Sequence, residues 1–280
     1  MHQTQQMRVS PLAQSDGPEA LSFLSERPVD NVIMSGFIRD NGVVSPRNRG
    51  RFFGCRNRQG ALEGVALVGH GMSFDSRSEA ATELFAALAR RSPESHLLMG
   101  ESGQVRSFWG YYAPGGAAPR KLREVTILEQ RRPFEGCEQA PDLRPALSEE
   151  LQQVAALHAE MVLEETGDDP LRTEPESFRL RCLRRIERGR TWVWSEGGRI
   201  VYKADVIAQT PEVAYLEGVY VSPRERGKGY GRRCLAQMGR RLLTRVTSVC
   251  LFVDEENERA RDFYLSTGYA PSSRYNILYF

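Results

Sequence analysis

The sequence predicts an α/β protein of two domains, each built around a mixed sheet flanked by helices. The first observation is the length, since 280 residues exceed the roughly 100 to 200 of an ordinary domain. The second is that strand-like runs alternate with segments of helical apolar spacing in both halves. The third is the stretch Arg131 to Pro145, which has three prolines and no apolar periodicity and therefore predicts a linker. The domains are expected at residues 1–135 and 140–280.

The N-terminal half predicts an α/β domain because helical and strand-like segments alternate along it. Turn residues separate most of these segments. In chain order we expect helices at Leu21 to Ser25 and Val29 to Ile38, strands at Arg51 to Arg56 and Leu62 to Val68, a helix at Ser78 to Arg91, a strand at His96 to Met99, a helix near Gln104 to Tyr111 and a strand at Arg123 to Leu128.

The C-terminal half predicts two helices, three antiparallel strands and then a strand-helix-strand unit, which favours parallel neighbours. The dipeptide Gly197-Gly198 predicts a hairpin turn between the first two strands. The expected elements are helices Glu149 to Glu164 and Glu176 to Arg188, strands Thr191 to Ser195, Arg199 to Ile207 and Ala214 to Val221, helix Tyr230 to Val246, strand Ser248 to Val253, helix Asn257 to Thr267 and strand Tyr275 to Phe280.

The two halves share a hint of repetition. Each ends in alternating strands and helices, and the tetrapeptide LEGV occurs at Leu62 to Val65 and again at Leu216 to Val219. Two origins fit these features: a decayed copy of the C-terminal domain, or an unrelated α/β domain.

Composition predicts a soluble cytoplasmic protein. Hydrophobic residues make up 40% and charged residues 26%, as in ordinary globular proteins. The net charge of +2 argues against a nucleic-acid partner, and the arginines between Arg179 and Arg190 are expected to form a solvated helix face. No apolar run is long enough for a membrane span, and MHQTQQMRVS does not resemble a secretion signal. The five scattered cysteines predict neither disulfides nor a metal site.

The segment Val219 to Arg233, VYVSPRERGKGYGRR, predicts a phosphate-binding loop between a strand and a helix. Gly227, Gly229 and Gly231 let the backbone approach an anion, and the first amides of the following helix point toward it. The basic residues around the glycines add positive charge, namely Arg224, Arg226, Lys228, Arg232 and Arg233. A diphosphate with a further phosphate would suit such a loop.

Two common phosphate-binding motifs do not fit this loop. The P-loop needs Ser or Thr after its lysine, whereas Gly229 follows Lys228. The dinucleotide-binding motif G-x-G-x-x-G does not fit either, because the glycines here occupy alternate positions. The preceding strand also follows hairpins, whereas in that motif the strand opens a chain of βαβ units.

The loop resembles the acyl-CoA motif of the GNAT N-acetyltransferases, in which arginine or glutamine is followed by two residues, a glycine, one residue and a glycine or alanine. Here the motif is Arg226-Gly227-Lys228-Gly229-Tyr230-Gly231, preceded by the strand Val219-Tyr220-Val221. A second segment, Asn257 to Tyr269, resembles the downstream GNAT motif of asparagine, two residues, alanine and F-Y. The resemblance covers about residues 140–280 and implies a C-terminal GNAT fold, with an N-terminal half that is degenerate.

The resemblance implies acetyl-CoA as co-substrate and no metal. Backbone groups of Val219, Tyr220 and Val221 would hold the pantetheine arm, and a bulge in that strand would supply an amide for the thioester oxygen. The residues from Arg226 to Arg232 would bind the diphosphate. Asn257 either faces the cofactor or only caps the helix that follows it.

Two residues are candidates for proton transfer. The resemblance implies that Tyr264 protonates the departing thiolate, and a tyrosine pKa of about 10 suits that role. The alternative for Tyr264 is a half-buried aromatic side chain whose hydroxyl bonds the backbone. Glu217, on the strand before the loop, is the candidate base that deprotonates the amine; the alternative is a structural or substrate-positioning carboxylate.

The predicted function is acetyl transfer to a primary amine by direct attack in a ternary complex. The acceptor is a small molecule or a protein amino group, and the chain is expected to act as a monomer or homodimer. The loop Glu164 to Asp169 is acidic and either attracts a cationic amine or is simply solvated. The alternative function is a catalytically silent sensor of acyl-CoA.

Overall fold

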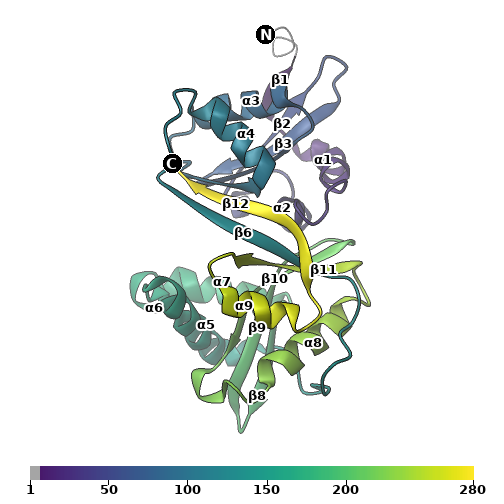
Figure 1. The fold of residues 1–280 in the computed structure, drawn as a ribbon, viewed down its shortest axis with the longest axis vertical. Helices are drawn as coiled ribbons and strands as arrows, with labels where there is room; N and C mark the ends of the chain where they lie inside the picture. Colours follow the sequence, from purple (N-terminus) through teal and green to yellow (C-terminus); the bar gives the residue numbers. More distant parts are fainter. Residues whose placement is uncertain (1–6) are drawn as a thin grey trace. The chain divides into compact units, whose positions relative to one another are not determined.

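The computed structural model describes residues 7–280, and these divide into two compact units (Figure 1). The N-terminal unit contains the chain up to Ile127 together with Val253–Asn257 and Pro271–Phe280; the C-terminal unit contains Leu128–Phe252 and Glu258–Ala270. This differs from the expected boundaries of 1–135 and 140–280, because the last strand belongs to the N-terminal unit. Residues 1–6 lie outside the described residues. They begin the segment MHQTQQMRVS, from which a cytoplasmic location was predicted in part.

The N-terminal unit is a mixed sheet with two pairs of helices. Its strands lie in the order β1-β2-β3-β4-β5-β12, antiparallel except for the parallel pair β4 and β5. Its elements are β1 Arg8–Pro11, α1 Gly17–Leu24, α2 Val32–Asn41, β2 Gly50–Arg56, β3 Leu62–Gly69, β4 Gly71–Ser76, α3 Glu79–Ala89, β5 Leu97–Glu101, α4 Ser102–Tyr112, most of β6 Lys121–Gln130 and nearly all of β12 Ala270–Tyr279.

The strands of the C-terminal unit lie in the order β7-β8-β9-β10-β11. The pair β10 and β11 is parallel, and the other pairs are antiparallel. Its elements are β7 Arg144–Pro145, α5 Leu151–Thr166, the short α6 Pro170–Thr173, α7 Pro175–Glu187, β8 Thr191–Glu196, β9 Arg199–Gln209, β10 Val213–Val221, α8 Tyr230–Leu242, β11 Ser248–Asp254, whose last residues join the N-terminal unit, and α9 Glu258–Leu265.

Helices cover both faces of the C-terminal sheet. On one face α5 and α7 pack against the strands, with Val154, Leu157, Ile186, Val193 and Tyr220 in one buried cluster. The apolar stripe of α8, which includes Leu235, Met238 and Leu242, is buried as well. The helices and strands predicted for this half are present, although α8 ends four residues before the expected Val246 and β12 begins five residues before the expected Tyr275.

The two halves of the chain, from β1 to β6 and from β7 to β12, repeat one order of elements: a strand, helices, three antiparallel strands, a helix, a parallel strand, a helix and a last strand. The tetrapeptide LEGV does not mark equivalent places in this repeat. Leu62–Val65 lies in β3, the second of its three strands, whereas Leu216–Val219 lies in β10, the third. The order of elements therefore supports a duplication, and the tetrapeptide does not.

Strand β4 was missing from the sequence prediction. Its residues Gly71 to Ser76 alternate between apolar and small or polar side chains, and both kinds are buried. Asp75 is buried there because the guanidinium groups of Arg27 and Arg77 pair with it at 2.6 and 2.7 Å. Glycine and aspartate are disfavoured in strands, so Gly71 and Asp75 weaken the strand signal despite the alternation, which explains the omission.

Within residues 7–280, no helix combines the length and the apolar character that a membrane span requires.

Candidate functional site

The glycine-rich segment forms a loop between β10 and α8, as the sequence predicts. Gly227 and Gly229 have φ of +81° and +84°, and a Cβ atom at either position would meet nothing within 4 Å. These glycines are therefore required by the backbone conformation and not by lack of space. Gly231 differs, because a Cβ there would lie 3.3 Å from Phe263 and from Val221. Close packing requires that glycine.

The N-terminus of α8 is open. Gly229 is its N-cap residue, and no side chain within the described chain caps its first turn. The corresponding helix of the N-terminal unit, α3, is closed: the hydroxyl of Ser78 accepts from the amide of Ala81, and Glu79 places a carboxylate in the first turn. Uncapped amides and the helix dipole attract anions. Of the two equivalent helix starts, only α8 is suited to a phosphate.

Arg226 holds the loop to α5 in this structure. Its guanidinium pairs with the Glu164 carboxylate at 2.7 Å and donates to the Val221 carbonyl at 3.1 Å. The Tyr220 hydroxyl donates to the same carboxylate at 2.7 Å. Glu164, which belongs to the predicted acidic loop, is thus already paired, and Asp169 of that loop accepts from an amide of α6.

Two further basic residues of the loop have partners nearby. The Lys228 ammonium pairs with Glu225 at 2.7 Å, on the exposed side of the loop. The exposed Arg232 guanidinium lies 5.2 Å from the centre of the Phe134 ring. Phe134 belongs to the predicted linker, which therefore packs on the C-terminal unit. The positive charge of the loop is partly balanced by Glu164 and Glu225, so the backbone amides are its clearest anion-binding feature.

Strand β10 separates from β11 halfway along its length. Its parallel register with β11 runs from Val213 opposite Ser248 to Leu216 opposite Leu251 and then ends. A bulge against β9 follows directly. Glu217 lies opposite Asp205 and Tyr220 lies opposite Lys203, so β10 advances by three residues where β9 advances by two.

The bulge is made possible by Gly218, whose φ is +63°. Such a conformation is strained for residues other than glycine. The bulge that the resemblance implies is therefore present, and it lies at residues 217–220.

Glu217 lies at the start of the bulge. Its side chain is exposed to solvent, and it has no hydrogen-bond or ion-pair partner within residues 7–280. Although the residue reaches solvent, the protein around its carboxyl displaces part of the hydration, and this desolvation, followed by the charge of Asp205, raises the carboxyl pKa above the ordinary value. A raised pKa makes a carboxylate a better proton acceptor near neutral pH.

Tyr264 is half-buried on α9. Its ring lies 5.2 Å from that of Phe263 and 6.0 Å from that of Tyr269, measured between ring centres. Burial, followed by the charge of Glu165, raises the pKa of its hydroxyl. Its hydroxyl has no hydrogen-bond partner among the described residues, which does not match the backbone-bonded alternative. The charge of Glu165 also raises the pKa of Glu217, so the Glu165 carboxylate acts electrostatically on both candidate residues, Glu217 and Tyr264.

Asn257 directly precedes α9. Its backbone amide donates to the Asp254 carbonyl at 2.9 Å. Both proposed roles of its side chain, contact with a cofactor and capping of α9, stay predictions.

Sequence reasoning missed a buried polar cluster beneath the bulge. Lys203 and Asp205, on β9, are 0% and 1% exposed and form an ion pair of 2.8 Å. The Lys203 ammonium also contacts Nδ1 of His158, and Thr191 donates to Asp205 at 2.6 Å. The signal was present in RIVYKADVIAQ, where two opposite charges two residues apart interrupt an apolar strand and must share one face.

This cluster predicts acid-sensitive stability. Burial, followed by the charge of Lys203, lowers the pKa of His158 to about 3. The unfolded chain, with a histidine pKa of about 6.5, therefore binds a proton that the folded chain rejects, and stability falls as the pH drops below about 6.5. We expect a loss of about 2 kcal/mol between pH 7.5 and pH 5 in denaturant titrations followed by circular dichroism.

The variant His158→Gln should lose most of that pH dependence, because glutamine can accept from Lys203 and does not titrate. His96→Gln is the matched control, since His96 is exposed. Equal slopes for His158→Gln and the wild type would contradict the assignment.

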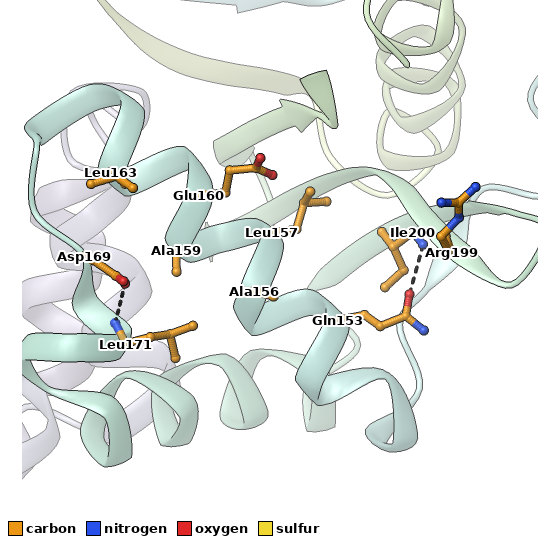
Figure 2. Close-up of a pocket in the computed structure, with 10 residues that line it drawn as sticks. All are labelled: Gln153, Ala156, Leu157, Ala159, Glu160, Leu163, Asp169, Leu171, Arg199 and Ile200. Carbon is orange, nitrogen blue, oxygen red and sulfur yellow. Dashed lines mark hydrogen bonds between the residues drawn. The ribbon is translucent and has the colours of Figure 1, made fainter. Parts of the chain in front are cut away.

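A pocket of about 520 Å³ lies along α5, between the start of β9 and α6, and no residue of the glycine-rich loop lines it (Figure 2). At one end the amide of Ile200 donates to Gln153, and at the other the amide of Leu171 donates to Asp169. None of the predicted site residues lines it. Its lining residues are Gln153, Ala156, Leu157, Ala159, Glu160, Leu163, Asp169, Leu171, Arg199 and Ile200.

Comparison with known proteins gives one family match, over residues 154–269, to the acetyltransferase (GNAT) family. This range contains every predicted site residue. A search of curated proteins gives no significant match.

Solved structures extend the likeness over both units. One is an acetyltransferase of the GNAT family from Colwellia psychrerythraea, 16% identical over 98% of this chain and 99% of that chain, with a TM-score of 0.63. Another is a tandem GNAT protein from the clavulanic acid biosynthesis pathway, 17% identical over 97% of each chain, with a TM-score of 0.61. At such identities the likeness concerns the fold. It confirms the expected C-terminal GNAT fold and the GNAT-like fold of the N-terminal half.

Proposed function

We propose, on the premise that residues 154–269 form an acetyltransferase domain of the GNAT family, that the protein transfers an acetyl group from acetyl-CoA to a primary amine. The observation that carries the proposal is an open helix N-terminus beside a bulged strand. The α8 amides suit a diphosphate, and the edge of β10 beyond Leu216 has no register partner on β11. That free edge suits the amide groups of a pantetheine arm.

Acetyl-CoA would be held mainly by backbone groups. In the proposal the amides of the loop and of the first turn of α8 bind the diphosphate, with the Arg232 guanidinium beside them. The backbone of Val219, Tyr220 and Val221 holds the arm, and Asn257 faces it. Arg226 contributes by fixing the loop to α5 through Glu164. The loop residues proposed to take part in binding acetyl-CoA are Arg226, Gly227, Lys228, Gly229, Tyr230, Gly231 and Arg232.

The proposed chemistry is direct attack by the amine. Glu217, alone or through a water molecule, removes a proton from the substrate ammonium so that the nitrogen has a free electron pair. A carbon-nitrogen bond forms at the thioester carbon, and an amide of the bulge stabilises the resulting oxyanion. The carbon-sulfur bond then breaks, and Tyr264 donates its proton to the thiolate. The former amine nitrogen gives up its second proton, through water, to the resulting tyrosinate, and Glu217 releases the first proton to solvent. The products are an acetylated amine and CoA, and no metal takes part.

A test is purified protein with acetyl-CoA and a panel of amines, read as release of free thiol. The panel should include polyamines, amino acid derivatives, aminosugars and peptides with a free amino group, because both small molecules and proteins are candidate acceptors. Amine-dependent thiol release supports the proposal. Tight binding of CoA without thiol release from any amine would favour the silent sensor, and no binding would exclude both.

Glu217→Gln is expected to lower kcat/KM for the amine about 100-fold while leaving the affinity for acetyl-CoA unchanged. The base works only when ionised, so wild-type kcat/KM should fall as the pH drops through the raised pKa of Glu217. The variant should lack that acidic limb. A pH-rate profile measures both effects, with Glu176→Gln on the exposed face of α7 as the matched control. An unchanged acidic limb in Glu217→Gln would move the role of base to another group.

A further inference from the structure

The buried ammonium of Lys203 has three acceptors, one for each of its hydrogens. These are Oδ2 of Asp205 at 2.8 Å, the backbone oxygen of Gly218 at 3.1 Å and Nδ1 of His158 at 3.1 Å. Thr191 in turn donates to the other oxygen of Asp205. The cation is therefore fully hydrogen-bonded, and its position is fixed by groups from β9, β10 and α5.

Stability alone is a poor explanation for this cluster. A fully buried ion pair contributes little net stability, because the cost of removing two charges from water offsets most of their attraction. Apolar residues of similar volume commonly pack as well or better at such positions. The contact that apolar residues could not replace is the one to the Gly218 carbonyl, because it requires a hydrogen-bond donor.

That carbonyl belongs to the peptide at the centre of the bulge. Neither Gly218 nor Val219 has a register partner on β9, and the register with β11 has already ended at Leu216. The neighbouring strands therefore do not fix this peptide. A Cβ atom on residue 218 would lie 2.8 Å from Nζ of Lys203, so the glycine also makes the approach of the ammonium possible.

The contact also determines where the adjacent amide points. No peptide bond in the described chain is cis, and in a trans peptide the carbonyl and the following N–H point in opposite directions. With the Gly218 oxygen held against Lys203, the Val219 N–H points away from the buried cluster. A cation on the carbonyl oxygen also polarises the peptide and makes its N–H a stronger donor.

We propose that Lys203 is a positioning residue for acyl transfer, which orients and polarises the Gly218–Val219 peptide so that the Val219 N–H binds the thioester oxygen. This inference rests on the proposed acetyl transfer and names the group that prepares its oxyanion site. Asp205 and His158 act through Lys203 by holding its ammonium in place.

The test replaces the ion pair by a neutral pair, Lys203→Met with Asp205→Asn. Arg185, whose Nε lies 3.7 Å from Oδ1 of Asp205, loses its carboxylate partner in this variant, but its side chain is 22% exposed and keeps contact with solvent. The asparagine oxygen can still accept from Thr191. We expect kcat to fall at least about 30-fold while KM for acetyl-CoA stays within about threefold, because the lost interaction is made mainly in the transition state. A purely structural role would instead change the unfolding temperature and leave kcat unchanged. The matched control removes another ion pair of the same unit, Arg144→Met with Glu150→Gln, and should keep wild-type kcat.

The outcomes separate this inference from the proposed function. If the wild type acetylates an amine and the folded double variant keeps kcat within threefold, the role of Lys203 is overturned while the function stands. If the wild type releases no thiol with any amine, both fall.

A second measurement uses the wild type and does not depend on the variant folding. Protein labelled with ¹⁵N-valine is titrated with CoA and, separately, with acetyl-CoA, and the Val219 amide signal is identified by its loss in Val219→Ile. The proposal expects this signal to shift further with acetyl-CoA than with CoA, since only acetyl-CoA carries the carbonyl oxygen. Equal shifts with both ligands would overturn it.

Discussion

Replacing Gly229 by glutamate is expected to weaken the binding of acetyl-CoA about 100-fold, which corresponds to about 2.7 kcal/mol. The carboxylate would lie at the N-terminus of α8, where it repels the diphosphate and competes for the amides that bind it. A Cβ at this position meets no neighbouring atom, so the effect does not come from a clash. Isothermal titration calorimetry with acetyl-CoA measures the loss.

The backbone strain of that substitution is controlled elsewhere in the chain. Gly60 has the same φ of +84° and equally open space, and it lies in the turn between β2 and β3. Gly60→Glu therefore introduces the same strain and the same charge away from the loop, and it should bind acetyl-CoA like the wild type. Equal binding by both variants would show that α8 does not hold the diphosphate.

Tyr264→Phe is expected to lower kcat by about 10² to 10⁴-fold with little change in KM for acetyl-CoA. Burial raises the pKa of the hydroxyl, so the proton is present throughout the neutral range and is available to the departing thiolate. The hydroxyl has no hydrogen-bond partner within residues 7–280, so its removal leaves no partner unsatisfied and should not alter the unfolding temperature. Steady-state kinetics with a productive amine measures the effect.

Tyr269 offers a matched control for this substitution. Its ring lies 6.0 Å from that of Tyr264, and its buried hydroxyl also has no partner among the described residues. Tyr269→Phe removes the same atom from a neighbouring site and should keep kcat within about twofold. A similar loss of kcat in both variants would point to general disturbance of α9 and away from proton donation by Tyr264.

Much of the C-terminal unit could be predicted from local sequence. The stripe of α8 and the hairpin at Gly197-Gly198 depend on near neighbours in the chain. The division into units could not be predicted in this way. That β12 pairs with β5 depends on contacts between residues about 180 positions apart, and the composition of Ala270–Tyr279 carries no sign of its partner.

The candidate site was predictable where glycine is conformationally required and not where distant side chains meet. Gly227 and Gly229 show their role in the sequence because a loop with positive φ needs them. The pairing of Arg226 with Glu164 was not visible, since 62 positions separate the two residues. The contact of Lys203 with the Gly218 carbonyl was hidden for the same reason: it exists only after the strands pair and the bulge forms.

The proposed transfer of an acetyl group from a thioester to an amine can be followed by ¹³C NMR, with acetyl-CoA labelled by ¹³C at the carbonyl and incubated with protein and the amine panel. With the wild type, we expect an amide carbonyl signal to replace the thioester carbonyl signal, and with Tyr264→Phe the same change should be far slower. A thioester signal that persists, or that converts only to acetate, would contradict the proposed transfer.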